Sequence, residues 1–521
     1  MNRTSRLLLL LVLLFCFTVS NLLANNLSVS NVTTTGQNTT SHYTYVQFDV
    51  SWDNSFRDTV NWDAAWIFIK YKTSDGIWHH ATLNTSGNTA PSGSTIDVSS
   101  DKKGAFIYRS ADGTGTFSPT GVQLRWNYGT DGVADNETIT IKVFAIEMVY
   151  VPTAAYTLGD DIIETAFINN STLDPASINT NLVVVRRNVI PHNDNGDDAQ
   201  ASYNGIGIDG DGGIDTDNNG SVDNSSYPTG YKAFYCMKYE ITQEQYADFL
   251  NTLTYDQQAA RTANAPNSSA GTGALVSGTP LNNNSIEIMT PGVSSTTPAV
   301  YGCDFNDNNT FNESGDGQNI ACNYINLSDG LAYADWAGLR PMTELEFEKA
   351  CRGDQSQHSD EYAWGTSSIN TTDFSISSQG SADESISSGY STTLGNANTT
   401  NQTVSGPLRA GIFAANILNS SRVTAGATYY GIMEMSGNLD ERCVTLGNST
   451  GRSFTGLHGN GALDSGGNFN VTNWATGMMG RRGGSFATNV AYLKVSDRQN
   501  VNDSSDTRTS SYGFRCVRTA Q

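Results

Sequence analysis

The stretch Gly330–Gly353, GLAYADWAGLRPMTELEFEKACRG, decides how the larger part of the chain folds. Its second half predicts a helix, because Thr343 and Glu346 have the spacing of a capping box and Gly353 suits a helix end. Its first half completes LSDGLAYADWAG, a shorter helix that we expect to begin at the cap residue Ser328. The apolar residues of both segments recur on one face, so we expect both helices to cover a buried core.

Outside this stretch, the C-terminal part shows little regular structure. ITQEQYADFLNTL predicts one further helix, capped by Thr242. Much of the rest, including 355–405, is rich in Ser, Thr, Gly and Asn, which favours loops. A compact unit with so much irregular chain requires an unusual fold, held by hydrogen bonds and bound ions.

Residues 27–147 have a different pattern. Short runs in which apolar and polar residues alternate are separated by turns of Gly, Ser, Asn and Asp, which is typical of strands with one buried face. We therefore predict an all-β, sandwich-like domain over 27–147. The alternating apolar positions are Val46, Phe48, Val50 and Trp52; Ile67, Ile69 and Tyr71; Val122, Leu124, Trp126 and Tyr128; and Ile139, Ile141 and Val143.

The first residues resemble a secretory signal peptide. Arg3 and Arg6 precede an apolar run over 7–19, and a small residue, Ala24, follows it. We expect residues 1–24 to be removed, and the mature protein to be secreted or held at a bacterial cell surface with no transmembrane segment. An uncleaved N-terminal anchor is the alternative.

The composition is acidic and rich in uncharged polar residues. The 521-residue chain has a formal net charge of −22, and charged residues make up only 15% of it. This balance repels phosphate backbones, so nucleic acid is excluded as a partner, whereas divalent cations are favoured. Aromatic residues make up 10%, which indicates a folded chain.

Six cysteines follow the expected signal peptide, and their spacing matches neither a CxxC pair nor a zinc site. Cys303 and Cys322 flank one acidic loop, and we expect a disulfide between them. The pairing of the others stays open: Cys236, Cys351, Cys443 and Cys516.

Several motifs beyond the opening stretch resemble one known family. MVYVPTAAYTLGD, FYCMKYEITQEQYADFLN, YAWG, YYGIMEMSGNLDERC, RRGGSF and GFRCVR follow one another in the order typical of the formylglycine-generating enzyme, or sulfatase-modifying factor, family. The resemblance covers 148–519. It implies a loop-rich, C-type-lectin-like α+β domain that carries an acidic insertion at 205–223.

The sequence departs from this family where catalysis would occur. Members that oxidise a sulfatase cysteine use a cysteine pair after the RGGS segment, but here no cysteine lies between Ser485 and Cys516. Cu(I) requires soft thiolate ligands, which Ser, Thr and Asn cannot replace. We therefore expect no catalysis of this kind and no catalytic residues.

Calcium is the cofactor that the sequence favours, at two places. The insertion GIDGDGGIDTDNNGSVD alternates oxygen donors before a glycine, as loops that wrap a hard cation do; a solvated acidic loop is the alternative. The GNVWEW motif of the family becomes GNLDER here and keeps two donors that the resemblance links to structural calcium. The candidate ligands are Asp209, Asp211, Asp215, Asp217, Asn219 and Asp223, and then Asn438 and Glu441. Asp304, Asn306 and Asn308 repeat the alternate spacing more weakly.

Two polar segments follow the RGGSF motif, one over 486–492 and one over 500–511. Their small and polar residues resemble the variable regions of proteins diversified by diversity-generating retroelements, in which Asn codons are targeted. An ordinary polar surface is the alternative. The candidate ligand contacts are Phe486, Ala487, Thr488, Asn489, Val490, Tyr492, Asn500, Asn502, Asp503, Ser505, Asp506, Arg508, Ser510 and Tyr512.

Together these features favour a secreted or surface-exposed recognition protein without catalysis of its own, directed at an extracellular protein or glycan. An active oxidase or sulfatase-maturation-type enzyme of the same family is the second interpretation. A structural component of a surface layer or matrix is the third.

Overall fold

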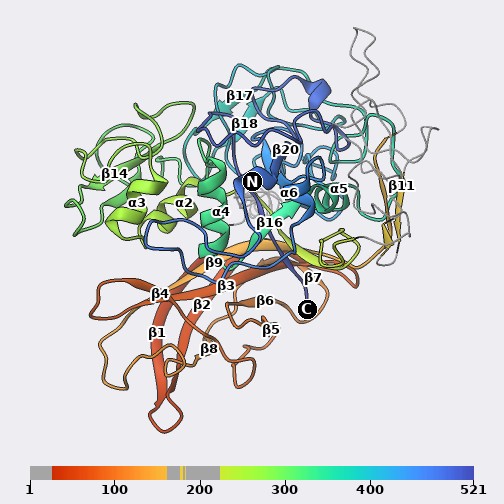
Figure 1. Ribbon diagram of the computed structural model, residues 1–521. Helices are drawn as coiled ribbons and strands as arrows, with labels where there is room; N and C mark the ends of the chain where they lie inside the picture. The colour runs from red at the N-terminus through yellow and green to blue at the C-terminus, as the bar shows by residue number, and fades with distance from the viewer. Residues whose placement is uncertain (1–25, 161–175, 180–181, 184–222) are drawn as a thin grey trace, which may run out of the picture.

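A computed structural model describes residues 26–160, 176–179, 182–183 and 223–521. The expected signal peptide, 1–24, lies outside these ranges, as does the acidic insertion except for Asp223. Figure 1 shows the N-terminal strands below a larger C-terminal part made mostly of loops with a few short helices. Within the described ranges, no helix combines the length and apolar character needed to cross a bilayer.

Residues 26–151, which are described throughout, form strands and no helix. Strands β1, β2, β7 and β8 make one antiparallel sheet, and β3 to β6 with β9 belong to a second. Their bounds are β1 (Ser28–Asn38), β2 (Tyr43–Arg57), β3 (Asp63–Lys72), β4 (Trp78–His80), β5 (Ser94–Val98), β6 (Ala105–Arg109), β7 (Gly113–Phe117), β8 (Val122–Trp126) and β9 (Thr140–Val151).

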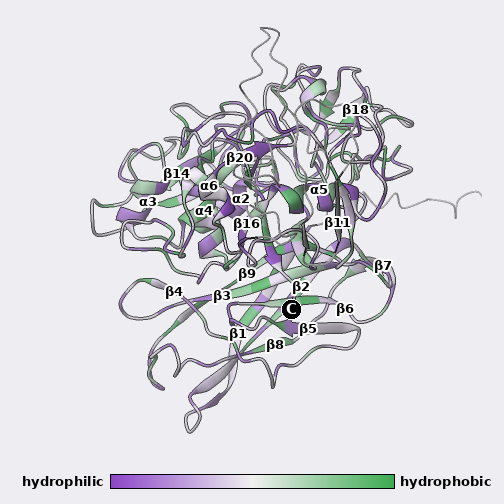
Figure 2. Ribbon diagram, turned by 45° about the vertical axis from the view of Figure 1, so that its right-hand side comes forward, coloured by the Kyte–Doolittle hydropathy of each residue, from purple (hydrophilic) through white to green (hydrophobic). Residues whose placement is uncertain are grey.

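An apolar core joins these two sheets. Alternate residues of β2, such as Phe48 and Trp52, are buried in it together with Ile67 of β3 and Leu124 of β8. Figure 2 shows hydrophobic and hydrophilic residues alternating along the strands. The alternation seen in the sequence therefore marks the face of each strand that packs inward.

Strand β3 is buried on both of its faces. Ile67 and Ile69 point into the core between the two N-terminal sheets, whereas Trp66 and Phe68 point into the main core of the C-terminal part. The indole Nε1 of Trp66 donates to the carbonyl of Ala337 at 2.9 Å. The N-terminal strands are thus packed against the C-terminal part through a central strand.

One sheet of ten strands runs through both parts, in the order β5–β6–β3–β9–β13–β21–β16–β19–β20, with β4 on β3. Strand β9 crosses the boundary expected at 147/148: it pairs with β3 along its length and with β13 through 148–151. The C-terminal strands of this sheet are β13 (Phe234–Met237), β16 (Arg340–Thr343), β19 (Glu441–Val444), β20 (Met479–Arg482) and β21 (Cys516–Thr519).

The helices begin largely where the sequence predicts. Those in the described ranges are α2 (Gln243–Leu250), α3 (Tyr255–Arg261), α4 (Leu327–Trp336), α5 (Glu344–Arg352) and α6 (Ser449–Arg452), with 3₁₀ turns η2 (Thr476–Met478) and η3 (Val490–Tyr492). Thr242 caps α2, and Thr343 with Glu346 forms the expected capping box of α5, which ends at Gly353 with φ of 72°.

The cap expected at Ser328 is wrong. Asn326 caps α4, because its side chain accepts from the amide of Asp329 while that carboxylate accepts from the amide of Asn326. This is the same reciprocal arrangement with Asn and Asp in place of Thr and Glu. Helix α3, which the sequence analysis missed, has a similar box formed by Thr254 and Gln257.

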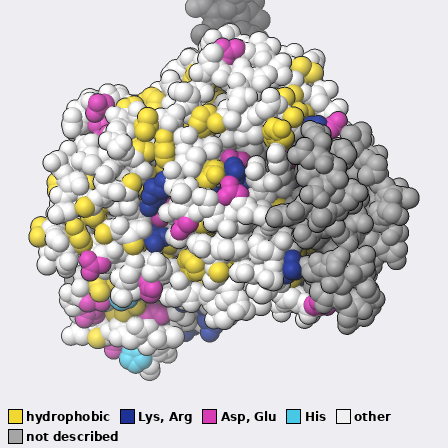
Figure 3. Space-filling model, turned by 45° about the horizontal axis from the view of Figure 1, so that its top comes forward, with side chains coloured by type: hydrophobic (Ala, Val, Ile, Leu, Met, Phe, Trp, Pro, Cys, Tyr) yellow, Lys and Arg dark blue, Asp and Glu magenta, His cyan; other side chains and the backbone are white. Residues whose placement is uncertain are grey.

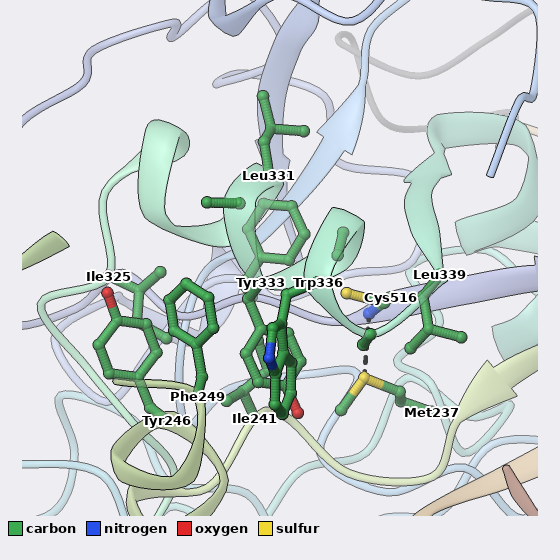
Figure 4. Packing of buried hydrophobic residues seen from close by; sticks show 14 of the residues in the cluster. Met237, Ile241, Tyr246, Phe249, Ile325, Leu331, Tyr333, Trp336, Leu339 and Cys516 are labelled. Atoms are coloured by element: carbon green, nitrogen blue, oxygen red, sulfur yellow. Dashed lines mark hydrogen bonds between the residues drawn. The ribbon is translucent and has the colours of Figure 1, made fainter. Parts of the chain in front are cut away.

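Small sheets complete the C-terminal part. They are built from β10 (Tyr156–Leu158), β11 (Ala176–Asn179) and β12 (Leu182–Val183), from β14 (Ile286–Thr290) and β15 (Val300–Cys303), and from β17 (Ser375–Ser377) and β18 (Ser385–Ser388). The main core lies between α2, α4 and the long sheet. In Figure 4, Phe249, Tyr333 and Trp336 face one another, and the amide of Cys516 donates to Met237 Sδ at 3.3 Å.

The disulfide expected between Cys303 and Cys322 is absent. All six cysteines in the described ranges are free and buried. Both of these side chains belong to the main core, where a thiol packs as a small apolar group. Burial raises the pKa of Cys303 and of Cys322, so both are protonated thiols.

Candidate ligand-binding surface

The two polar segments lie in the connection between β20 and β21, two strands of the ten-stranded sheet. The chain leaves β20 through Gly483 and Gly484, both with positive φ, and returns as β21. At Gly483 a Cβ would lie 2.9 Å from the carbonyl oxygen of Met435, so this turn requires glycine both for its backbone angle and for space. The RGGS motif therefore fixes the point from which the first segment starts.

A buried network of ion pairs holds the frame behind these segments. Arg482 of β20 pairs with Glu344 at 3.0 Å and with Glu348 at 2.7 Å, both on α5. Arg498, which lies between the two polar segments, pairs with the same Glu344 at 2.7 Å. Burial by itself raises the pKa of Glu344, but the two guanidinium groups outweigh it and bring this pKa below its ordinary value.

A second buried pair anchors the far end. Arg515 pairs with Glu441 at 2.7 Å and donates to the carbonyl oxygens of Met237 and Met433. All of these groups lie in the interior, where losing one partner of a pair is costly. The ends of 483–515 are thus fixed by charge pairs that face away from solvent.

The first segment exposes only part of what the sequence predicts. Phe486 is 7% exposed and packs with Leu439, while its amide donates to the carbonyl of Asn438 at 2.9 Å. Tyr492, at the end of η3, is 44% exposed. Ala487 and Asn489 are exposed as well. Phe486 is therefore an anchor, which corrects its expected role as a ligand contact.

The second segment is held by arginines that the sequence analysis missed. Arg442 donates to the carbonyls of Asp503 and Ser505 at 2.8 and 3.0 Å. Arg481 pairs with Asp503 at 2.7 Å and with Asp440 at 3.0 Å. Both guanidinium groups also lie against the ring of Tyr512, at 4.2 and 4.8 Å from its centroid.

These contacts explain the residue that departs from the GNVWEW motif. Asp440 supplies the carboxylate for Arg481, and its backbone bonds to Ser511 and Gly513. Tyr512 is 8% exposed beneath the two arginines, so its expected role as a ligand contact is corrected to an internal support.

The end of the second segment is tied to the start of α4. Asp506 accepts from the amide and hydroxyl of Ser328 at 2.9 and 2.6 Å. Arg508 donates to the carboxylate of Asp329, which Arg261 also contacts, and to the carbonyl of Tyr324. These two predicted contact residues are bound to the framework, although Asp506 is also exposed.

The structure brings the two segments to the two sides of one short strip, 438–440. The amide of Phe486 bonds to Asn438 on one side, and the amide of Asp440 bonds to the carbonyl of Ser511 on the other. The candidate positions exposed there are Ala487, Asn489, Tyr492, Asn502 and Asp506, and the exposed Ser504 and Thr507 belong with them. Thr488, Val490, Asn500, Asp503, Ser505, Arg508 and Ser510 are half-buried.

Of the expected calcium ligands, Asp209, Asp211, Asp215, Asp217 and Asn219 lie outside the described residues, and Asp223 is exposed at their edge. Asn438 donates to Glu240 at 2.5 Å and accepts from the amide of Leu408 at 2.8 Å, while Glu441 is paired with Arg515. No group of three or more His, Cys, Asp or Glu side chains in the described part of the chain is placed to hold a metal ion. Calcium at both places stays a prediction.

A cavity of about 530 Å³ lies elsewhere, between β9 and α2. Glu240, Glu244 and Asp248 line it together with Phe144 and Trp336. None of the fourteen candidate contact residues is among its lining residues. The exposed positions of the two segments thus lie outside this cavity. Figure 3 shows one face of the molecule, on which charged side chains are sparse.

The comparison with family models decides the relationship. The sulfatase-modifying factor enzyme 1-like domain matches residues 210–520, more than half of the chain. The chain belongs to this family. Its framework arginines and the RGGS turn thus lie inside the family domain, and the strands before β9 lie outside the matched range.

Other comparisons add little. No curated protein matches the chain. Among solved structures, variable protein 1 of Treponema denticola is similar with 12% sequence identity and a TM-score of 0.31, over 72% of this chain and 96% of that one. At that TM-score the superposition is too poor for roles to be carried from one residue to another.

Proposed function

We propose that this protein is a secreted or cell-surface, non-catalytic binding protein that displays a changeable recognition surface on a sulfatase-modifying factor scaffold. The lectin-like character of that scaffold, the removal of residues 1–24 and the extracellular protein or glycan ligand are parts of the same proposal. Calcium bound by the acidic insertion would stabilise it.

One observation carries the proposal. Among residues 481–512, Arg481, Arg498 and Arg508 pair with Asp440, Glu344 and Asp329, while small residues such as Ala487 and Ser504 and the ring of Tyr492 are exposed. Exposed side chains that support no neighbour can change without unfolding the frame. Small polar groups with one aromatic residue are also suited to adaptable binding.

We expect no conversion of a sulfatase-motif cysteine to formylglycine. The family reaction requires soft thiolate ligands for copper, and the segment between Ser485 and Cys516 contains no cysteine. Mass spectrometry of a cysteine-containing sulfatase peptide, incubated with the protein, copper and oxygen, should match a sample without protein. Turnover above that sample would establish the enzymatic alternative.

Exchanging exposed residues should alter binding and leave stability nearly unchanged. We expect the triple variant Tyr492→Ala, Ser504→Ala and Thr507→Ala to lose the binding that the parent shows on a glycan array or to immobilised extracellular proteins. Each change should alter the free energy of unfolding by about 0.5 kcal/mol or less, because none removes a buried group.

The control for this triple variant is Asp383→Asn, an exposed change in the same domain. It should retain both binding and stability. If the triple variant binds as the parent does, the two segments are not the recognition surface.

A further inference from the structure

A loop of acidic and amide residues, 304–316, follows β15 and folds back on itself. The carboxylate of Asp304 accepts from the amides of Asn308 and Asn309 at 3.1 and 2.7 Å. The carboxylate of Asp316 accepts from the amide of Glu313 at 2.7 Å and from Asn306 Nδ2 at 2.8 Å. Both aspartates are fully buried, whereas Asp307 and Glu313 of the same loop are exposed.

Glu287 lies on the neighbouring strand, directly opposite Gly302 in the β14–β15 pair. It is fully buried, and within the described part of the chain neither of its oxygens has a hydrogen-bond partner beyond a marginal interaction with the Thr279 hydroxyl. Its Oε2 and the Oδ1 of Asn309 lie 3.8 and 3.1 Å from the position that a Cβ on Gly271 would take. The two oxygens therefore face the same space.

No positive side chain from this part of the sequence balances these carboxylates. The sequence contains no Lys, Arg or His between Arg261 and Arg340, yet the strand pair and its loop carry Glu287, Asp304, Asp307, Glu313 and Asp316. Burial, with the nearby aspartates, raises the pKa of Glu287 to about 7. A buried carboxylate with no partner is strongly disfavoured unless it takes up a proton or a cation.

We propose that Glu287, together with amide oxygens of the loop 304–316 such as Asn309 Oδ1, forms a divalent-cation site, with calcium as its ion. The donors are carboxylate and amide oxygens, with no sulfur or imidazole, which is the ligand set of hard cations. The bound ion would tie this loop to β14 and neutralise Glu287.

The experiment uses the full mature chain carrying Asp215→Asn and Asp217→Asn, which weaken the other expected calcium loop. Calcium is titrated by calorimetry, and melting is recorded in calcium and in chelator. We expect calcium binding to remain in this background, and Glu287→Gln to weaken it about tenfold or more. In chelator, at a pH above the pKa of about 7 at which Glu287 is ionised, the same change should raise the melting temperature, because a buried charge has been removed.

A second variant tests the site in case Glu287→Gln does not fold. Asn309→Gly removes one amide oxygen at an exposed position with φ of 62°, an angle that glycine adopts without strain. It should also weaken calcium binding while the circular dichroism spectrum stays unchanged. If the background protein binds no calcium, or if folded Glu287→Gln and Asn309→Gly bind it as the background does, the site does not exist and Glu287 is simply protonated.

Discussion

Replacing Glu344 by Gln should destabilise the protein by about 3–5 kcal/mol, as expected when one partner of a buried ion pair is removed. Glu344 is 1% exposed and faces both Arg482 and Arg498, so the change leaves two buried guanidinium groups short of negative charge. Urea unfolding followed by circular dichroism measures the loss. It is a large share of the 5–15 kcal/mol typical of a folded domain.

The matched control is again Asp383→Asn, which removes one carboxylate charge from an exposed position. Its effect should stay within about 0.5 kcal/mol. Equal effects of the two changes would show that the buried network does not hold the frame of the C-terminal segments.

Replacing Phe514 by Ala should also cost about 3–5 kcal/mol, the range for truncating a buried phenylalanine. Phe514 is fully buried in the main core, and a Cβ at Gly330 of α4 would lie 2.0 Å from its ring. Truncation therefore opens a void between α4 and the strand that closes the sheet. Urea unfolding again measures the change.

Tyr492→Ala is the control for this truncation, because it removes an aromatic ring that is 44% exposed. We expect it to leave stability almost unchanged. A loss for Phe514→Ala no larger than the loss for Tyr492→Ala would contradict the division between framework and surface.

Local patterns allowed much of the fold to be predicted. The caps at Thr242 and Thr343 depend on residues three positions apart, and the strands before 147 depend on alternation within each run. The cap spacing and the alternation each involve residues that are close together in the chain, so a single sequence is enough to recognise them. At the start of α4, Asn326 has Asp329 at the position that completes the box, whereas Ser328 is already the second residue of the helix.

Contacts between distant segments were not predictable. Strand β3 is buried on both faces because α4 and the turn after it cover one of them. These segments lie more than 250 residues away from β3 in the sequence. Nor could the sequence show that Arg442 and Arg481 would enclose Tyr512 and hold Asp503. The two segments stay a predicted surface, and their exposed and supporting residues could be separated only in three dimensions.

The most direct test of the central claim is to sequence this locus in closely related strains. We predict that substitutions concentrate at the exposed positions of the two segments, while the framework residues do not change. The exposed positions are Ala487, Asn489, Tyr492, Asn502, Ser504 and Thr507, and the framework residues are Glu344, Arg442, Arg481, Arg498, Phe514 and Arg515. Identical segments in all strains, or substitutions spread evenly over both groups, would contradict the account of a changeable recognition surface.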